Sequence, residues 1–144
     1  SQLGLRAQLW TELRRGDLEA DPARPLVVDT IGELEAFYAL ADIVFVGGSL
    51  IPHGGQNMLE PAGLGRPVVY GPHVANFQHE AELMERHGAS RRVSDADELG
   101  RTLAELVGDP GERARMAAAG VEAAESQRGA SERTLEALRE LQLV

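Results

Sequence analysis

The residues best suited to chemistry form the segment Gly54-Gly55-Gln56-Asn57-Met58-Leu59-Glu60-Pro61. Two glycines precede an expected helix start, where free backbone N–H groups can point at an anion. Asn57 is a suitable capping residue for that helix. Glu60 falls in its first turn, where a carboxylate opposes a phosphate but can accept two hydrogen bonds from vicinal ribose hydroxyls. A capping box on an ordinary helix is the competing interpretation of the same residues.

A second candidate segment, Asp29-Thr30-Ile31-Gly32-Glu33-Leu34, joins the end of an expected strand to the start of an expected helix. Gly32 would let the chain approach a ligand closely there. Glu33 has a simpler alternative role, as an acid in the first turn that complements the helix macrodipole.

The sequence predicts no metal site. It contains no cysteine, and none of its four histidines forms an H-E-x-x-H pair. His53 and His73 fall in loops, where we expect them to face solvent or to contact a ligand. Arg91-Arg92 is expected to be the solvated end of a strand. The sequence also lacks both the G-x-x-x-x-G-K-[ST] and the G-x-G-x-x-G phosphate loops.

Short apolar runs alternate with helical patterns over the first two thirds of the chain. This alternation predicts an α/β fold, with a Rossmann-like parallel sheet covered by helices on both faces and followed by a helical C-terminal tail. The expected strands lie near 26–29, 43–46, 67–70 and 90–93.

The glycines point to one edge of this sheet. Seven of the 16 glycines fall between Gly47 and Gly71, after successive strands, and Gly48-Ser49 directly follows the strand near 43–46. Because the carboxyl ends of parallel strands meet at one edge, where ligands bind in open α/β sheets, we expect a ligand site there.

Helical spacing and capping residues predict the remaining elements. Asp95 with Glu98 forms a capping box, and Asp109-Pro110 opens another helix. The other expected helices are a first one carrying Leu5, Leu9 and Leu13, one following the Asp29–Gly32 turn, one from about Asn57, one from Asn76 to His87, and a last one carrying Leu135, Leu138 and Leu141.

Length and composition restrict the class of protein. The 144 residues suit one domain, and 43% hydrophobic content suffices for a core. A net charge of −9 argues against a nucleic-acid-binding module. No apolar run is long enough to span a bilayer, and no signal peptide opens the sequence. Because the chain starts at Ser1 inside an expected helix, we expect 1–144 to be one domain of a longer protein.

Taken together and in order, these segments resemble Kdo transferases of lipopolysaccharide synthesis, which transfer 3-deoxy-D-manno-oct-2-ulosonic acid (Kdo). The resemblance is strong over residues 25 to 93 and looser in the helical tail. The combination of D-T-x-G-E-L with G-G-x-N-x-L-E is the most specific part. The other matching stretches are Ala41 to Leu50, Pro67 to His73, and Asn76-Phe77.

The resemblance implies that this chain is the C-terminal, CMP-sugar-binding half of a GT-B glycosyltransferase, whose two Rossmann-like domains face each other across a cleft. It also implies which segments bind CMP and that neither cofactor nor metal is needed. The implied substrate-binding residues are Ile31, Gly32, Glu33, Leu34, Asn57, Met58, Leu59 and Glu60, and the glycine-rich edge adds Gly48, Ser49, Gly54 and Gly55.

The resemblance further implies an inverting transfer of Kdo from CMP-Kdo to a lipid A precursor at the cytoplasmic face of the bacterial inner membrane. The general base, the acceptor site and the membrane contact would lie in an N-terminal domain outside this chain, together with a Pro-Arg segment that contacts the donor. No catalytic residue is therefore expected within 1–144, and the chain alone is expected to be inactive.

Two other functions fit the same residues less well. One is a UDP-sugar enzyme of the same fold, such as an N-acetylglucosaminyltransferase or a non-hydrolysing epimerase, whose helix starts resemble this one. The other is a non-catalytic nucleotide-binding module. Competition between CMP and UDP separates the first alternative from a Kdo transferase.

Overall fold

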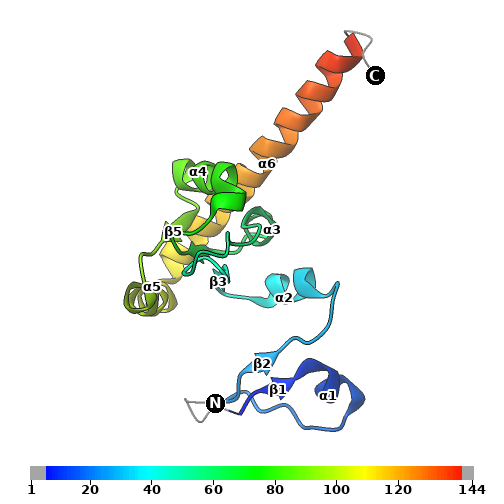
Figure 1. The fold of residues 1–144 in the computed structure, drawn as a ribbon, viewed down its shortest axis with the longest axis vertical. Coiled ribbons are helices and arrows are strands. Elements are labelled where there is room, and N and C mark those ends of the chain that lie inside the picture. Colours follow the sequence, from blue (N-terminus) through cyan, green and yellow to red (C-terminus); the bar gives the residue numbers. More distant parts are fainter. Residues whose placement is uncertain (1–5, 141–144) are drawn as a thin grey trace. The chain divides into compact units, whose positions relative to one another are not determined.

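The computed structural model describes residues 6–140, with side chains for residues 6–129 and for Arg139 (Figure 1). The chain divides into two compact units, Ser1–Phe37 and Tyr38–Val144, and each is described by itself. Leu5 and Leu141, which were expected to belong to the first and last helices, lie outside the described residues.

The first unit contains a strand where the sequence predicted a helix. Strand β1 (Gln8–Leu9) pairs in parallel with β2 (Leu26–Val27), and helix α1 (Trp10–Arg15) begins only after it. The N–H of Gln8 donates to Pro25 O at 2.8 Å, and the Gln8 side-chain amide donates to Asp21 O at 2.8 Å. The i, i+4 leucine spacing was misleading here because pairing with a distant strand overrides local helical periodicity.

The second unit is built on a parallel sheet whose strand order is β3-β4-β5. The strands are β3 (Val44–Phe45), β4 (Val68–Tyr70) and β5 (Ser90–Arg92). Val44 pairs with Val68, and Val68 pairs with Ser90. The structure thus confirms that the strands expected near 43–46, 67–70 and 90–93 form one parallel sheet. The strand expected near 26–29, β2, is not part of it, because it pairs with β1 in a separate sheet.

Both faces of this sheet are covered, as the sequence predicted. In β4, Val68 and Tyr70 belong to one buried cluster, whereas Val69 between them belongs to another, because successive strand residues face opposite sides. The first cluster includes residues of α4 (Gln78–His87) and α3 (Leu59–Gly63). The second includes Leu106 of α5 (Ala96–Gly108), on the other side of the sheet (Figure 1).

The helices begin close to the expected positions. The helix expected from Asn76 opens as the 3₁₀ turn η1 (Ala75–Phe77) and continues as α4. Asp95 caps α5 by accepting the N–H of Glu98 at 2.8 Å. The return bond of the expected capping box is shifted by one residue, because the Glu98 carboxylate accepts the N–H of Ser94.

The tail is a single helix, α6 (Pro110–Glu140), where two helices were expected. No proline follows Pro110, so nothing in the covalent chain forces a break in the 31-residue helix. Gly120 lies against Ala62 of α3, where an added Cβ would come within 3.1 Å of the Ala62 carbonyl oxygen. The side chains of Leu135 and Leu138 are not among those described.

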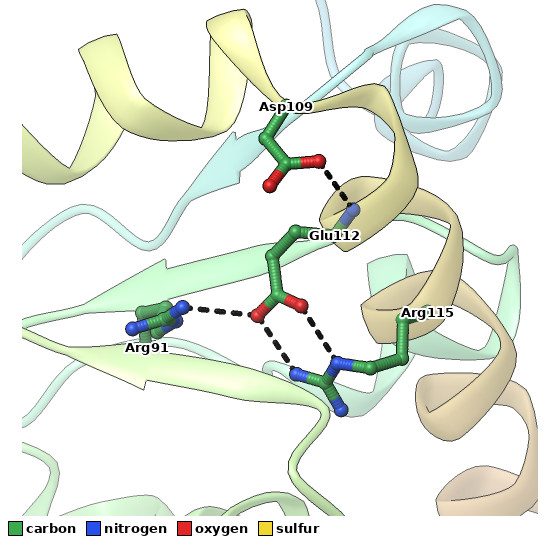
Figure 2. Close-up of polar contacts among 4 residues, drawn as sticks. All are labelled: Arg91, Asp109, Glu112 and Arg115. Atoms are coloured by element: carbon green, nitrogen blue, oxygen red, sulfur yellow. Dashed lines mark hydrogen bonds and ion pairs between the residues drawn. The ribbon is translucent and has the colours of Figure 1, made fainter.

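The start of α6 is tied to β5 by a polar network (Figure 2). The N–H of Glu112 donates to Asp109 Oδ1 at 2.9 Å, which caps the helix. The Glu112 carboxylate binds Arg91 of β5 at 2.9 Å and Arg115 of its own helix at 2.7 and 2.8 Å. Arg91 is therefore solvated, as expected, and is also paired, because the capped helix start holds a carboxylate beside the strand.

Candidate functional site

Ser49, one of the predicted site residues, is fully buried and joins the loops that follow β3 and β4. Its hydroxyl donates to Val46 O and accepts the N–H of Gly71 at 2.8 Å, and its carbonyl accepts the N–H of His73 at 2.9 Å. A Cβ on Gly71 would collide with the backbone of Ser49. Ser49 thus holds the carboxyl edge of the sheet together from below the surface.

Three of the predicted glycines, Gly48, Gly54 and Gly55, lie in the loop that follows β3 at this edge. The N–H of Gly55 donates to Gly48 O at 3.3 Å, which folds the loop back on itself. Gly54 has a φ of 91°, and a Cβ there would collide with the side-chain amide of Asn76. Only glycine satisfies both conditions, because side chains disfavour positive φ and the neighbouring amide fills the space. The loops after β3 and β4 therefore converge, as their sequence positions predicted.

The helix predicted from about Asn57 begins two residues later, at Leu59. Asn57 Oδ1 accepts the N–H of Leu59 at 3.0 Å, and its Nδ2 donates to Glu60 Oε1 at 3.1 Å. Glu60 is exposed, Leu59 is half-buried and Met58 is fully buried with its backbone, so the expected contact of Met58 with a ligand is not open in this structure. Helix α3 has just five residues.

Amide groups just before α3 remain available to a ligand. Within the described part of the chain, the N–H groups of Gln56 and Asn57 have no protein acceptor, and neither residue is buried. Two neighbouring free donors beside an exposed carboxylate can bind a phosphate and a diol together.

Tyr38 lies near the same carboxylate and was not singled out by the sequence. Burial, and secondarily the negative charge of Glu60, raise the pKa of Tyr38. It occupies the apolar face expected for the second helix, α2 (Leu34–Leu40). Nothing in its spacing distinguished it from a core aromatic residue.

The Ile31–Leu34 turn lies in the first unit, where Glu33 is fully engaged. Its carboxylate accepts hydrogen bonds from the Thr30 hydroxyl, from Trp10 Nε1 at 3.2 Å and from Arg14 at 2.8 Å. The Thr30 hydrogen bond is the main cause that lowers the pKa of Glu33, with Trp10 and Arg14 adding to it. Glu33 precedes α2, so it fixes the turn rather than sitting in the first helical turn.

The remaining residues of this turn are open to solvent. Ile31 is fully exposed and Leu34 is about half exposed, which is unusual for apolar side chains of this size. Gly32 has a φ of 88° and no atom near its missing Cβ, so glycine is required there by backbone conformation alone. The turn therefore presents apolar side chains on a backbone that Glu33 holds in place.

A pocket of about 600 Å³ opens between the loops of the second unit. Its walls come from the segment after β3, the segment after β4, the end of β5 and the first turns of α4. The lining residues include His53, Gly54, His73, Asn76, Glu85 and Arg92. Both loop histidines expected to face solvent or a ligand thus line a cavity. Arg92, expected to be simply solvated, also lines it, and its place at a strand's carboxyl end was the available signal.

Glu85 organises one wall of this pocket. The hydroxyl of the buried Tyr70 donates to Glu85 Oε1 at 2.6 Å, and Arg92 Nη1 lies 3.8 Å from the same oxygen. Burial is the main cause that raises the pKa of Tyr70, and the bond to Glu85 adds to it. Tyr70 therefore stays a hydrogen-bond donor and fixes the carboxylate.

The described structure shows neither a cluster of metal-ligating side chains nor a helix suited to a membrane. Among residues 6–140, no group of three His, Cys, Asp or Glu side chains is arranged to hold a metal ion. No helix in that range combines the length and apolarity needed to cross a membrane.

Comparison with known proteins gives close matches in sequence. No protein-family model matches the chain. The 3-deoxy-D-manno-octulosonic acid transferase of Haemophilus influenzae is 36% identical over 138 residues, covering 94% of this chain and 32% of that protein. The enzyme of the same name from Bordetella pertussis is 39% identical over 113 residues, covering 78% and 26%. The chain thus spans about a third or less of the length of these relatives.

A solved structure matches the fold. The C-terminal CMP-Kdo binding domain of WaaA from Acinetobacter baumannii superposes with a TM-score of 0.75 at 29% identity, covering 85% of this chain and 62% of that one. The parallel sheet, its two helical layers and its glycine-rich carboxyl edge define the C-terminal half of a GT-B glycosyltransferase. Within that class, the chain has several homologues among the 3-deoxy-D-manno-octulosonic acid transferases, and its structural match is a C-terminal CMP-Kdo binding domain.

Proposed function

We propose that this chain is the donor-binding domain of an inverting Kdo transferase, which moves Kdo from CMP-Kdo to a lipid A precursor in lipopolysaccharide biosynthesis. The observation that carries the proposal is the match to a structure described as a CMP-Kdo binding domain, at 29% identity over 85% of this chain. The sequence relatives, named as transferases of the same sugar, support it.

In this proposal the segment before α3 binds the nucleotide. The free N–H groups of Gln56 and Asn57 hold the phosphate, while the exposed Glu60 carboxylate accepts hydrogen bonds from the ribose diol. The resemblance also implies CMP contacts for the Ile31–Leu34 turn, whose apolar side chains are exposed in the first unit. Leu59 completes the segment before Glu60, and Gly48, Ser49, Gly54 and Gly55 shape the loop that brings it to the sheet edge.

The proposed reaction needs a second domain. A hydroxyl of the acceptor attacks the anomeric carbon of Kdo, the bond from that carbon to the phosphate oxygen breaks, and CMP leaves as an anion with inversion at the sugar. The backbone N–H groups stabilise the charge that develops on the phosphate. We assign the general base, the acceptor site and the membrane contact to the part of the protein outside this chain, at the cytoplasmic face of the bacterial inner membrane.

The decisive experiment titrates the complete protein with CMP, UMP and UDP by calorimetry. We expect CMP to bind at least ten times more tightly than either uracil nucleotide, and we expect CMP-Kdo to act as donor for a lipid A precursor. Tighter binding of UDP would contradict the proposal and favour a UDP-sugar enzyme of the same fold. Binding of CMP without any transfer by the complete protein would favour a non-catalytic module.

A further inference from the structure

We propose that the pocket beside Gly54 takes the sugar-acid half of the donor, and that Arg92 binds the sugar's carboxylate. The inference rests on the proposed function, because it names what the same site does with the rest of its ligand. The pocket measures about 600 Å³, room enough for an eight-carbon sugar.

The position of the pocket supports this assignment. Pro52, His53 and Gly54 form one wall, and the chain passes from there directly into the amide groups before α3. The pocket wall and those amides thus belong to one continuous segment, as a site for the two halves of one donor requires. Asn76 also lines the pocket, packed against Gly54 so closely that no side chain fits at position 54.

The pocket wall offers both kinds of group that a polyhydroxylated acid requires. Glu82 and Glu85 supply carboxylate oxygens that can accept bonds from sugar hydroxyls. Donors come from Asn76 and from the rings of His53 and His73, whose side chains make no hydrogen bond within the described residues. These acceptors and donors would suffice for a neutral sugar. The carboxylate of a sugar acid needs a cation in addition.

Arg92 is the cation of the pocket wall, and it is held loosely enough to bind a ligand. Its Nη2 donates to Pro72 O at 3.3 Å, and its Nη1 lies 3.8 Å from Glu85, beyond hydrogen-bonding distance. Guanidinium groups carry five N–H donors in a planar fork that matches a carboxylate. The remaining donors of Arg92 are therefore free to bind one.

The neighbouring carboxylates do not cancel this role. Glu85 already accepts the Tyr70 hydroxyl at 2.6 Å, and Glu82 accepts the side-chain amide of Gln78 at 3.2 Å. Each is thus partly satisfied before the ligand arrives. An incoming carboxylate at Arg92 would replace the long contact to Glu85, which frees an oxygen of Glu85 for a sugar hydroxyl.

Arg91 provides a matched control on the same strand. Successive side chains of a strand face opposite sides of the sheet, so Arg91 faces away from Arg92. Arg91 binds Glu112 at 2.9 Å and does not line the pocket. Arg91→Gln and Arg92→Gln therefore remove the same charge from adjacent positions, and only the second changes the proposed sugar site.

The test measures inhibition by CMP, the KM for CMP-Kdo and the KM for the acceptor in the complete protein with each substitution. For Arg92→Gln we expect a ten- to hundred-fold rise in the KM for CMP-Kdo with unchanged CMP inhibition, the size of a lost charge-assisted bond. Arg92→Lys should recover part of the loss, and Arg91→Gln should change none of the three constants.

Three results would overturn the inference while leaving the proposed function intact. They are an unchanged KM for CMP-Kdo in Arg92→Gln, an equal change in Arg91→Gln, or a rise confined to the acceptor KM, which would give the pocket to a phosphate or carboxylate of the acceptor. Failure of the wild-type protein to bind CMP would instead refute the proposed function. Thermal melts of each variant confirm that it is folded.

Discussion

Glu60 is the residue whose role depends most on what binds beside it. Among the described residues, its carboxylate accepts the Asn57 side-chain amide at 3.1 Å and no backbone N–H, so the expected capping box does not form. Orienting Asn57 and binding a ribose both fit this geometry, and the charge of the carboxylate distinguishes them. Orienting Asn57 needs an acceptor oxygen, which glutamine also has, whereas two strong bonds from a diol need the negative charge.

We therefore predict that Glu60→Gln weakens CMP binding by about ten- to a hundred-fold, as hydrogen bonds to a charged group contribute roughly 1.5–3 kcal/mol. Calorimetric titration of the complete protein with CMP measures the effect. Glu105→Gln, an exposed change in α5, serves as control and should leave the affinity unchanged. If Glu60→Gln binds CMP as tightly as wild type, Glu60 only orients the Asn57 side chain.

Gly71 allows the loops after β3 and β4 to approach closely, because it has no side chain. A Cβ there would collide with the carbonyl of Ser49, the same backbone group that binds His73. We predict that Gly71→Ala destabilises the fold by about 1–3 kcal/mol, since backbone on both sides leaves little room to relax. Chemical denaturation gives the free energy of unfolding.

Gly100 is the matched control for that substitution. It lies inside α5 with no atom near its missing Cβ. Gly100→Ala should therefore stabilise the protein by about 0.5–1 kcal/mol through helix propensity. Destabilisation by both alanines to the same extent would show that the Ser49–Gly71 approach is not the cause.

At the scale of whole elements, the start of α6 is where helix and sheet are joined. The N–H of Glu112 donates to Asp109, and the Glu112 carboxylate is bound by two arginines, one from β5 and one from α6 (Figure 2). The hydrogen bond from Arg115 is the main cause that lowers the pKa of Glu112 to about 2, and Arg91 adds to it. The ion pairs therefore persist well below neutral pH.

The pH dependence of this network has a definite sign. The folded pKa of about 2 lies below the ordinary value of 4.5, so the ion pairs stabilise the fold fully above that value and lose their effect as the pH falls toward 2. Both arginine side chains are about half exposed, at 49% and 53%, so water screens the attraction. We expect roughly 1 kcal/mol at pH 7.

Thermal melts of wild type and Glu112→Gln test this. The melting temperature of the variant should be lower by a few degrees at pH 7, and the gap should close as the pH falls below 4.5. Glu122→Gln, an exposed change further along α6, should leave the melting temperature unchanged at every pH. A gap between wild type and Glu112→Gln that stays constant with pH would rule out the ion pairs as its source.

At the scale of the whole molecule, the chain covers about a third or less of the length of its transferase relatives. We expect the 144-residue chain alone to bind CMP but to transfer no Kdo, because we assign the general base to the part outside it. General-base assistance typically contributes 10²–10⁴-fold in rate, and the acceptor would also be unbound. Mass spectrometry of the acceptor after incubation with CMP-Kdo measures transfer. Product formed by the purified chain would show that it contains the catalytic groups after all.

Features that depend on neighbouring residues were predictable from the sequence. Apolar runs rich in β-branched residues indicated β3 and β4, and the caps at Asp95 and Asp109 indicated two helix starts within a residue. Glycines after successive strands indicated the edge where the loops converge. These signals are local because strand propensity, capping and turn conformation involve atoms only a few residues apart.

Tertiary structure alone decided features that depend on distant partners. Gln8–Leu9 is a strand because Leu26–Val27 pairs with it, against its own helical spacing. Ser49 is a buried link between loops rather than a surface donor, and Arg92 borders a pocket while its neighbour Arg91 binds α6 on the other side of the sheet. Each outcome depends on hydrogen bonds and packing between segments far apart in the chain, which no local pattern encodes.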